Sequence, residues 1–412
     1  MKVLHISQYI SIAKDKKFSR NISGYGYMVL DIAKSESEYD FSSQIDLITH
    51  NCITIGKKMG NLALLPRTWL DIIRNMRLKY IIQSLKIILH THYSLFWILR
   101  IIFYYLGIGH ILSTIKNNAY DIVHLHGICY SMVPVIQYCQ KNKVKFTVTL
   151  HGLTSFDESI NITKQEKILE RNFLQLVKKD NLNITVVSSG VKKQILAYLS
   201  LEEADNITVI LNGIYLTQYE NKINVRNMYQ IKLSEKIILC VGNINTRKNQ
   251  MSLLYALQYI SVSIKKDFKI LFLGDDNTGN FRKNIYDLDI RDNIVFCGNI
   301  PRDIIYEYYS QADYTILVSK DEGFGLSIIE GFLYGLPCIT FADLEAIKNL
   351  YNPKVMHLIH ERTDKALADG IVQAVSKEWD KEFIKKYACQ FSIETMAREY
   401  ILHYKRIIHE EI

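Results

Sequence analysis

The sequence predicts an α/β fold in which two Rossmann-like, doubly wound domains follow one another along the chain. Three observations lead to this prediction. The chain has 412 residues, which is more than one ordinary domain needs and about what two require. Short apolar runs alternate with longer amphipathic stretches along its length, a pattern typical of parallel strands covered by helices on both faces. A polar stretch without clear periodicity, 213–232, divides these runs into two series of similar size.

Each series holds enough candidate strands for one doubly wound sheet. The first consists of Val3–Ser7, Ile45–Thr49, Ile122–Leu125, Phe146–Leu150, Ile184–Val187 and Ile207–Leu211. The second consists of Lys236–Val241, Lys269–Gly274, Ile294–Cys297, Tyr314–Val318 and Pro337–Phe341. We therefore expect an N-terminal domain at 1–215, a C-terminal domain at 216–391 and a last helix at 392–412. The packing face of that helix is expected from the helical spacing of Ile393, Met396, Tyr400 and Tyr404.

The composition is that of a globular protein, with 48% hydrophobic and 22% charged residues and only 5 Pro. It excludes a disordered or collagen-like chain. The 7 Cys are scattered and form no Cys-x-x-Cys pair, so neither a disulfide framework nor a structural zinc site is expected. The first residues are too polar for the core of a signal peptide. These features together predict a cytoplasmic protein.

The positive charge is confined to the first half of the chain. Residues 1–215 hold 25 Lys and Arg against 16 Asp and Glu, whereas residues 216–412 hold 25 against 26. Such a balance first suggests nucleic-acid binding, but the sequence contains no recognisable nucleic-acid module, and charge alone is poor evidence. No nucleic-acid partner is therefore predicted.

One segment, 72–120, combines positive charge with dense apolar and aromatic residues. No acidic residue lies between Asp71 and Asp121, and the segment contains six basic ones. Three interpretations stay open: helices packed against the first sheet, an amphipathic surface that lies on an anionic membrane, and a membrane span. A span is disfavoured because Arg100 would lie at its centre, at a cost of roughly 2.5–3.5 kcal/mol.

The stretch 319–332 carries the most specific chemical signal. Gly323 and Gly325 precede an apolar helical pattern, and glycines at such a place let backbone N–H groups face an anion such as a diphosphate. Glu322 lies in the loop before the helix, within reach of a sugar, and Glu330 lies just over one turn into it. Paired carboxylates are also used by hydrolases, but two acids on one segment beside a phosphate-type loop suit nucleotide binding better.

Glu322-Gly323-Phe324-Gly325-Leu326, followed by Glu330 and by Gly335-Leu336-Pro337, resembles the signature of the family 4 retaining glycosyltransferases of the GT-B fold, of the bacterial surface-polysaccharide type. The resemblance extends over nearly the whole chain. Gly24-Tyr25-Gly26 resembles the family's glycine loop after the first strand, and His151 resembles its histidine at a strand end. Asn212-Gly213-Ile214 resembles the motif between the two domains. The stretch 241–249 resembles the phosphate loop, and 296–300 resembles the loop that passes the nucleobase.

The resemblance implies three catalytic residues and a set of donor-binding residues. Glu322 would orient the sugar ring, Lys248 would neutralise the departing diphosphate, and His151 would contact the sugar or the acceptor hydroxyl near the reaction centre. The residues expected to bind the donor are Gly24, Gly26, Asn243, Arg247, Lys248, Asn299, Ile300, Gly323, Phe324, Gly325, Leu326 and Glu330. The sequence departs from the family at position 243, where Asn stands in place of Arg. Arg247 is a candidate substitute.

The implied reaction transfers a sugar, with retention, from a nucleotide diphosphate-sugar to a saccharide acceptor, expected to be lipid-linked. The expected setting is O-antigen, capsule or exopolysaccharide synthesis at the inner face of the plasma membrane. His124 and His126 share one strand face, but no third ligand has a recognisable spacing, so no metal is expected. The alternatives are a soluble GT-B enzyme, either a glucan-type transferase or a sugar-nucleotide epimerase, and a catalytically silent scaffold.

Overall fold

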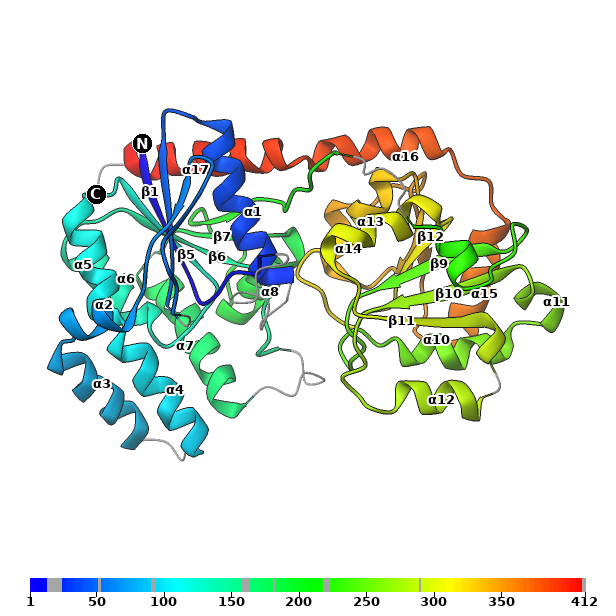
Figure 1. The fold of residues 1–412 in the computed structure, drawn as a ribbon, viewed down its shortest axis with the longest axis horizontal. Coiled ribbons are helices and arrows are strands. Elements are labelled where there is room, and N and C mark those ends of the chain that lie inside the picture. The colour runs from blue at the N-terminus through cyan, green and yellow to red at the C-terminus, as the bar shows by residue number, and fades with distance from the viewer. Residues whose placement is uncertain are drawn as a thin grey trace.

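The computed structural model describes residues 1–12, 24–50, 53–89, 94–156, 163–180, 182–217, 223–288 and 290–409. Of the segments discussed above, 72–120 and 392–412 therefore each lose a few residues, namely 90–93 and 410–412. Two α/β domains lie side by side, with the N-terminal domain on the left of Figure 1 and the C-terminal domain on the right. The prediction of two Rossmann-like domains is confirmed.

The N-terminal sheet has the strand order β3-β4-β2-β1-β5-β6-β7-β8, and all neighbouring pairs are parallel except β3 with β4. Its strands are β1 (Lys2–Ser7), β2 (Gln44–Thr49), β3 (Lys57–Met59), β4 (Leu62–Leu64), β5 (Ile122–His126), β6 (Phe146–Leu150), β7 (Ile184–Val186) and β8 (Ile207–Val209). The sequence analysis missed β3 and β4. Strand β3 holds two lysines among its three residues, so it lacks the apolar run by which the other short strands were recognised.

Helices cover both faces of this sheet. They are α1 (Gly24–Tyr39), α2 (Trp69–Arg74), α3 (Leu78–Leu89), α4 (Leu95–Leu106), α5 (Ile108–Asn118), α6 (Met132–Lys141), α7 (Lys164–Lys179) and α8 (Ser189–Leu199). Segment 72–120 thus forms helices, as expected. Of these, α5 packs in the core, whereas α3 and α4 protrude at the corner far from the C-terminal domain (Figure 1).

The C-terminal sheet has the order β11-β10-β9-β12-β13-β14, which is the 3-2-1-4-5-6 order of a dinucleotide-binding Rossmann domain. Its strands are β9 (Lys236–Val241), β10 (Phe268–Leu273), β11 (Ile294–Gly298), β12 (Tyr314–Leu317), β13 (Cys338–Phe341) and β14 (Met356–Ile359). Strand β14 was not predicted, because its four residues include a histidine and it forms the edge of the sheet. All neighbouring strands of the C-terminal sheet pair in parallel.

The helices of this half are α9 (Val225–Met228), α10 (Met251–Ala256), α11 (Val262–Lys265), α12 (Phe281–Asp287), α13 (Arg302–Gln311), α14 (Leu326–Leu333), α15 (Asp364–Ser376), α16 (Lys381–Ala388) and α17 (Ile393–His409). Short 3-10 turns lie at Leu257–Tyr259, Arg291–Asn293, Glu345–Asn349 and Cys389–Phe391.

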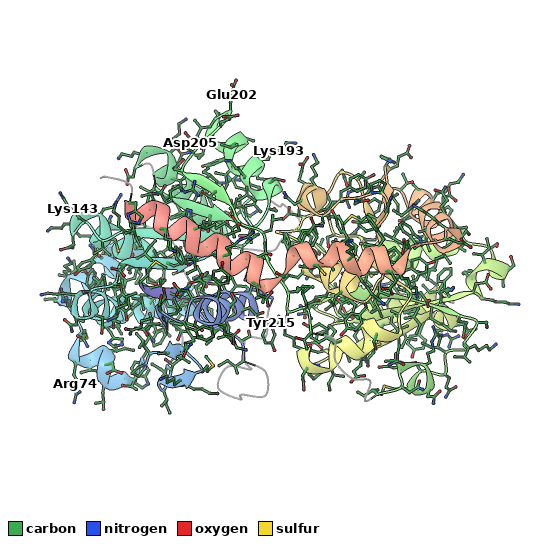
Figure 2. All side chains as sticks on the ribbon, turned by 90° about the horizontal axis from the view of Figure 1, so that it is seen from above. Arg74, Lys143, Lys193, Glu202, Asp205 and Tyr215 are labelled. Atoms are coloured by element: carbon green, nitrogen blue, oxygen red, sulfur yellow. The ribbon has the colours of Figure 1, made fainter. Side chains whose placement is uncertain are left out.

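The last two helices span both domains, as the view from above shows (Figure 2). Helix α16 packs on α14 of the C-terminal domain, and α17 packs on α1 of the N-terminal domain. The predicted face of α17, formed by Ile393, Met396, Tyr400 and Tyr404, is buried in one apolar cluster with residues of α1, β1 and β2. The last helix therefore crosses back onto the first domain.

The two chain crossings between the domains lie against each other. The Ile214 N–H donates to the Phe391 oxygen over 2.9 Å, and the Ile393 N–H donates to the Ile214 oxygen over 2.9 Å. A Cβ atom on Gly213 would lie 2.5 Å from the Ser392 oxygen, so only glycine permits this approach. The Asn-Gly-Ile motif thus contains an isolated bridge, Ile214 with Ser392, that pairs the two crossings.

Candidate active site

The carboxyl ends of the two sheets meet at one place, where open α/β sheets bind ligands. A Cβ atom on Gly323, in the loop after β12, would lie 2.2 Å from the backbone oxygen of His151, which follows β6. The hydroxyl of Ser188, after β7, donates to the Gly323 oxygen over 2.7 Å. The structure thus brings the predicted strand-end histidine of one domain against the signature loop of the other.

Glu322 lies at the centre of a charged cluster in this loop. Its carboxylate is paired with the Lys248 ammonium and, over 3.3 Å, with the Arg247 guanidinium. The Ser319 hydroxyl donates to it over 2.7 Å. Burial by itself raises the pKa of Glu322, but the two cations outweigh burial and hold that pKa below its ordinary value. Glu322 is therefore an anion, and it is paired with Lys248 and Arg247, the two cations that are expected to bind a diphosphate.

Lys248 is positioned by a loop that two side chains hold in shape. The Asn245 side-chain oxygen accepts from the Lys248 N–H over 2.9 Å, and the buried Gln250 amide donates to the backbone oxygens of Gly242 and Asn243. Helix α10 begins only at Met251, so Lys248 lies in the turn before the helix and not at its start. The sequence analysis missed both supporting residues, because polar residues in a loop carry no signal of their own.

Arg247 is the residue that supplies the second positive charge. The Asn243 side chain is engaged elsewhere, since its oxygen accepts from the Asp275 N–H over 3.0 Å. The Arg247 guanidinium instead reaches both the Glu322 carboxylate and, over 3.0 Å, the backbone oxygen of Asp321. Arg247 thus lies beside Glu322 together with Lys248, and its role as a substitute for an arginine at position 243 stays a prediction.

The start of α14 offers its backbone to an anion. Gly325 has a φ of +99°, a left-handed conformation that glycine adopts without strain, and it directly precedes Leu326, the first residue of the helix. The Phe324 side chain is buried in the core, so this residue faces the site only through its backbone. The first turn of α14 therefore forms a positive helix end, where backbone N–H groups can face an anion.

Glu330 lies one turn further and is held from two sides. The Tyr309 hydroxyl donates to its carboxylate over 2.9 Å. Burial raises the pKa of Glu330, whereas the Arg302 charge and the Tyr309 hydrogen bond act in the opposite direction. Arg302 also forms a 2.6 Å ion pair with Asp31 of α1, which connects the two domains beside Glu330.

The remaining predicted donor-binding residues are Gly24, Gly26, Asn299 and Ile300. We expected Gly24 and Gly26 to form a loop, but they belong to the first turn of α1. A Cβ atom on Gly26 would lie 2.4 Å from the Ser11 hydroxyl, so packing already requires this glycine, whereas Gly24 has no described neighbour so close. Asn299 is exposed and Ile300 is half-buried after β11. Their contact with a nucleobase stays a prediction.

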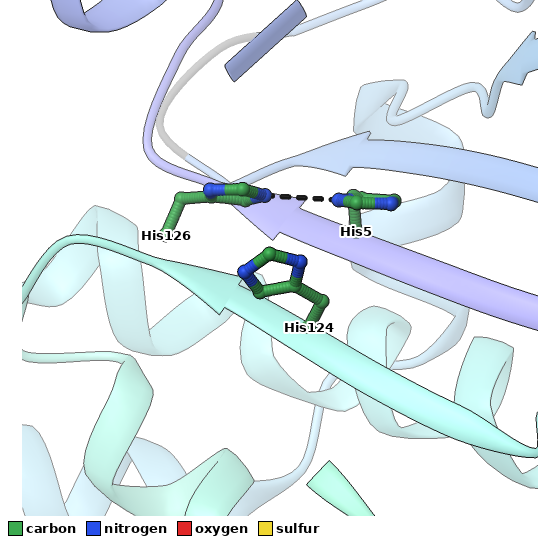
Figure 3. A group of neighbouring side chains, drawn as sticks. All are labelled: His5, His124 and His126. Atoms are coloured by element: carbon green, nitrogen blue, oxygen red, sulfur yellow. Dashed lines mark hydrogen bonds between the residues drawn. The ribbon is translucent and has the colours of Figure 1, made fainter. Parts of the chain in front are cut away.

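Behind His151 lies a group of buried histidines. His5, His124 and His126 are fully buried side by side (Figure 3), and one ring nitrogen from each lies within 4.8 Å of one nitrogen from each of the others. The sequence analysis considered only the last two and found no third ligand. His5, on the neighbouring strand β1, completes a group of three histidines that could hold a metal ion. Burial lowers the pKa of His124 and His126 well below the ordinary value and that of His151 to about 4, so these rings are neutral.

Comparisons with known proteins agree with this geometry. Residues 82–218 match the model of the family described as Glycosyltransferase Family 4, and residues 221–391 match that of Glycosyl transferases group 1. An uncharacterized glycosyltransferase of Methanocaldococcus jannaschii is 26% identical over 71% of this chain and 77% of its own length.

A UDP-Gal:alpha-D-GlcNAc-diphosphoundecaprenol alpha-1,3-galactosyltransferase of Escherichia coli is 24% identical over 55% of this chain and 59% of its own length. Among solved structures, Anabaena HepE in complex with UDP superposes with a TM-score of 0.67 at 16% identity, over 98% of this chain and 100% of that one. At this identity the structural match shows the fold alone. Fold, site and both family models define the class: the chain belongs to the family 4 glycosyltransferases of the GT-B fold.

Proposed function

We propose that the protein is a retaining hexosyltransferase that moves a sugar from a nucleotide diphosphate-sugar to a lipid-linked saccharide, in the synthesis of a bacterial surface polysaccharide such as O-antigen, capsule or exopolysaccharide. The observation that carries the proposal is the pairing of Glu322 with Lys248 and Arg247 opposite His151. It supports a nucleotide donor because both cations and the start of α14 converge on one place suited to a diphosphate.

When the bond between the sugar and the diphosphate breaks, negative charge develops on the diphosphate and positive charge on the sugar ring. Different residues stabilise the two charges. The diphosphate oxygens compete with Glu322 for Lys248 and Arg247, and these two cations then stabilise the negative leaving group. Glu322, released from them, is free to accept hydrogen bonds from the sugar hydroxyls and to stabilise the cationic ring. Because the side chains of this cluster supply the positive charge, the proposed reaction needs no resident metal.

Donor binding extends over the C-terminal domain in this proposal. The backbone of Gly323 to Leu326 binds phosphate, Glu330 accepts from a ribose diol, and Asn299 and Ile300 pass the base. Gly24 and Gly26 approach the donor from the other domain. The bound UDP of the HepE structure and the UDP-Gal named for the Escherichia coli relative both support a nucleotide of this kind.

The proposed membrane partner rests on an apolar-basic face formed by α2, α3 and α4. Its large apolar side chains are 44 to 80% exposed, and they are Trp69, Leu70, Ile73, Met76, Leu78, Ile82, Leu85, Leu89, Leu95, Phe96 and Leu99. Exposed basic residues lie among them, namely Arg74, Arg77, Lys79 and Lys86, with no acid between 72 and 120. Such a face is complementary to an anionic bilayer, which suggests a cytoplasmic protein held peripherally at the inner leaflet.

A span is less well supported than a peripheral contact. The stretch Leu95–Asn118 is long and apolar enough to cross a membrane, but 44% of its most apolar window is buried inside the protein. Its second half, α5, lies in the core of the N-terminal domain. A lipid-linked acceptor fits the peripheral arrangement, and the diphosphoundecaprenol named for the Escherichia coli relative supports it.

The donor is tested by incubating the purified protein with the common UDP-, GDP- and ADP-sugars and measuring nucleotide release and sugar transfer. Release with one donor, abolished by Glu322→Ala in a protein that still unfolds cooperatively, is expected. If no donor is turned over with any saccharide or lipid-linked acceptor, the scaffold alternative replaces the proposal. Transfer to a free glucan, or epimerisation of the donor, would instead favour a soluble enzyme.

The membrane contact is tested by flotation with vesicles of anionic or zwitterionic lipid. Leu78→Glu and Leu95→Glu each remove a side chain that is about 70% exposed on the apolar-basic face. Since insertion of one leucine contributes about 1.5–3 kcal/mol, each change should weaken binding to anionic vesicles at least about tenfold. Leu233→Glu is the matched control, because Leu233 is 92% exposed on the C-terminal half. Equal flotation of all variants would favour the soluble alternative.

A further inference from the structure

A chain of hydrogen bonds runs from His151 into the N-terminal domain and ends on Glu36 of α1. The His151 Nε2 and His126 Nδ1 atoms are 3.3 Å apart, and the His126 Nε2 and His5 Nδ1 atoms are 2.9 Å apart (Figure 3 shows the second bond). The His5 Nε2 atom lies 2.9 Å from the Glu36 carboxylate. His126, His5 and Glu36 have no exposed surface, so water cannot substitute for any of these partners.

The carboxylate gives this chain a direction. A glutamate carboxylate at neutral pH only accepts hydrogen bonds, so His5 must carry its proton on Nε2. With a single proton on its ring, His5 has one donor and one acceptor nitrogen, which leaves its Nδ1 as an acceptor; a second proton on His5 would reverse every step of the relay, and the histidine spectra described below detect it. His126 must then donate from Nε2 and accept on Nδ1. His151 in turn must donate from Nε2, which leaves its Nδ1 lone pair for another partner.

The same carboxylate organises a second branch that ends on the last helix. The Tyr404 hydroxyl of α17 donates to Glu36 over 2.8 Å and accepts from the His124 Nδ1 over 2.6 Å. The His124 Nε2 then accepts from the Thr149 hydroxyl over 2.6 Å. Both nitrogens of His124 are therefore used, which accounts for the histidine group through hydrogen bonds without a bound ion.

We propose that Glu36, acting through His5 and His126, is a positioning residue that holds His151 in its Nε2–H tautomer and so presents the Nδ1 atom as a hydrogen-bond acceptor to a sugar hydroxyl. Among the described residues, no partner occupies His151 Nδ1, and the residue lies half-buried against the signature loop. This role rests on the proposed glycosyl transfer. The relay itself is defined by the folded chain and does not depend on it.

The tautomers are tested in the protein without substrate by long-range ¹H–¹⁵N spectra of ring-labelled histidine. We expect the Nε2–H pattern for His5, His126 and His151 and the Nδ1–H pattern for His124, with signals assigned by single substitutions. An Nδ1–H or a doubly protonated His151 at neutral pH would overturn the proposal. So would stoichiometric zinc in the purified protein, because a metal on these histidines would replace the hydrogen bonds.

The functional consequence is tested by breaking the relay at its middle. His5→Phe keeps a ring but removes the acceptor for His126, and kcat should fall roughly 10–100-fold, the usual effect of losing an outer-shell partner, while KM for the donor stays near its normal value. His5→Asn places an acceptor where Nδ1 was and should recover most of the turnover.

The matched control for this experiment is His403→Phe. His403 is a buried histidine of α17 that bonds to Thr147 over 3.1 Å and stands outside the relay. An equal loss of kcat in His403→Phe, or no recovery in His5→Asn, would show a merely structural role. If the protein transfers no sugar at all, the spectra still decide on the relay, so the two failures are distinguishable.

Discussion

Two buried polar clusters flank the candidate active site, one from each domain. Burial leaves histidine rings of one cluster neutral, whereas the central carboxylate of the other stays ionised. Behind His151, the rings of His124 and His126 are neutral because burial lowers their pKa values. Around Glu322, burial is outweighed by Lys248 and Arg247, so the carboxylate stays ionised.

The difference follows from the presence of counter-charges. Within the part of the chain that the structure describes, the rings of His124 and His126 bond directly to no carboxylate and give up their charge, whereas Glu322, paired with two cations, keeps its charge. The charged cluster therefore suits exchange of one anion for another, as when a diphosphate replaces Glu322. The neutral histidine rings suit a neutral partner, such as a sugar hydroxyl. The direction of their hydrogen bonds determines which ring nitrogen can accept from that partner.

The largest effect should come from removing charge on the C-terminal side. Lys248→Met keeps an apolar stem and loses the ammonium beside Glu322, so kcat for sugar transfer should fall roughly 10²–10³-fold. Turnover is measured at saturating donor. Lys385→Met is the control, because Lys385 forms an exposed 2.7 Å pair with Glu382 outside the site. Wild-type turnover in Lys248→Met would contradict a role at the leaving group.

An intermediate effect concerns pH and separates the two clusters. His151 and His403 have pKa values of about 4 in the folded protein, against an ordinary 6.5. Below pH 6.5 the unfolded chain therefore binds protons that the folded chain refuses, and the free energy of unfolding falls. The loss is about 1.4 kcal/mol per pH unit for each such histidine. Above pH 6.5 these histidines contribute no pH dependence.

Urea unfolding at about pH 7 and pH 5 measures this loss, expected to be about 2 kcal/mol for each histidine. The pKa of Glu322 is lowered, so its stabilising contribution persists until the pH falls below the ordinary 4.5. Acid should thus weaken the histidine cluster first. His403→Phe should reduce the pH dependence by one histidine's share. Equal stability at both pH values would show that the buried rings are not held neutral.

The smallest effect tests the substitution of one cation for another within the charged cluster. Arg247→Ala should raise KM for the donor roughly tenfold, since one charge-assisted hydrogen bond is lost. Adding Asn243→Arg should recover part of that loss, and only part, because Asn243 also holds the Asp275 N–H. An unchanged KM in the single variant would mean that Arg247 serves Glu322 alone.

Much of the charged cluster could be predicted from the sequence because its members are close along the chain. Ser319, Glu322 and Glu330 belong to one strand–loop–helix unit, and Asn243, Arg247 and Lys248 belong to another. Glycine spacing and strand ends locate such units before any fold is known. The sequence offered Arg247 only as a candidate substitute for the arginine missing at position 243, and the path of the loop places its guanidinium beside Glu322.

The histidine cluster could not be predicted in this way. His5, Glu36, His126 and Tyr404 come from four separate elements, β1, α1, β5 and α17, and none has a motif around it. The pairing of β1 with β5 and the return of α17 onto α1 bring them together.

The sequence by itself thus determined the two-domain α/β fold and located the loops that we propose to bind an anion, because both depend on local periodicity and spacing. Only the tertiary structure decided which buried groups form the hydrogen-bonded histidine relay and which form the ion pairs of Glu322, because both depend on partners from separate elements of the chain.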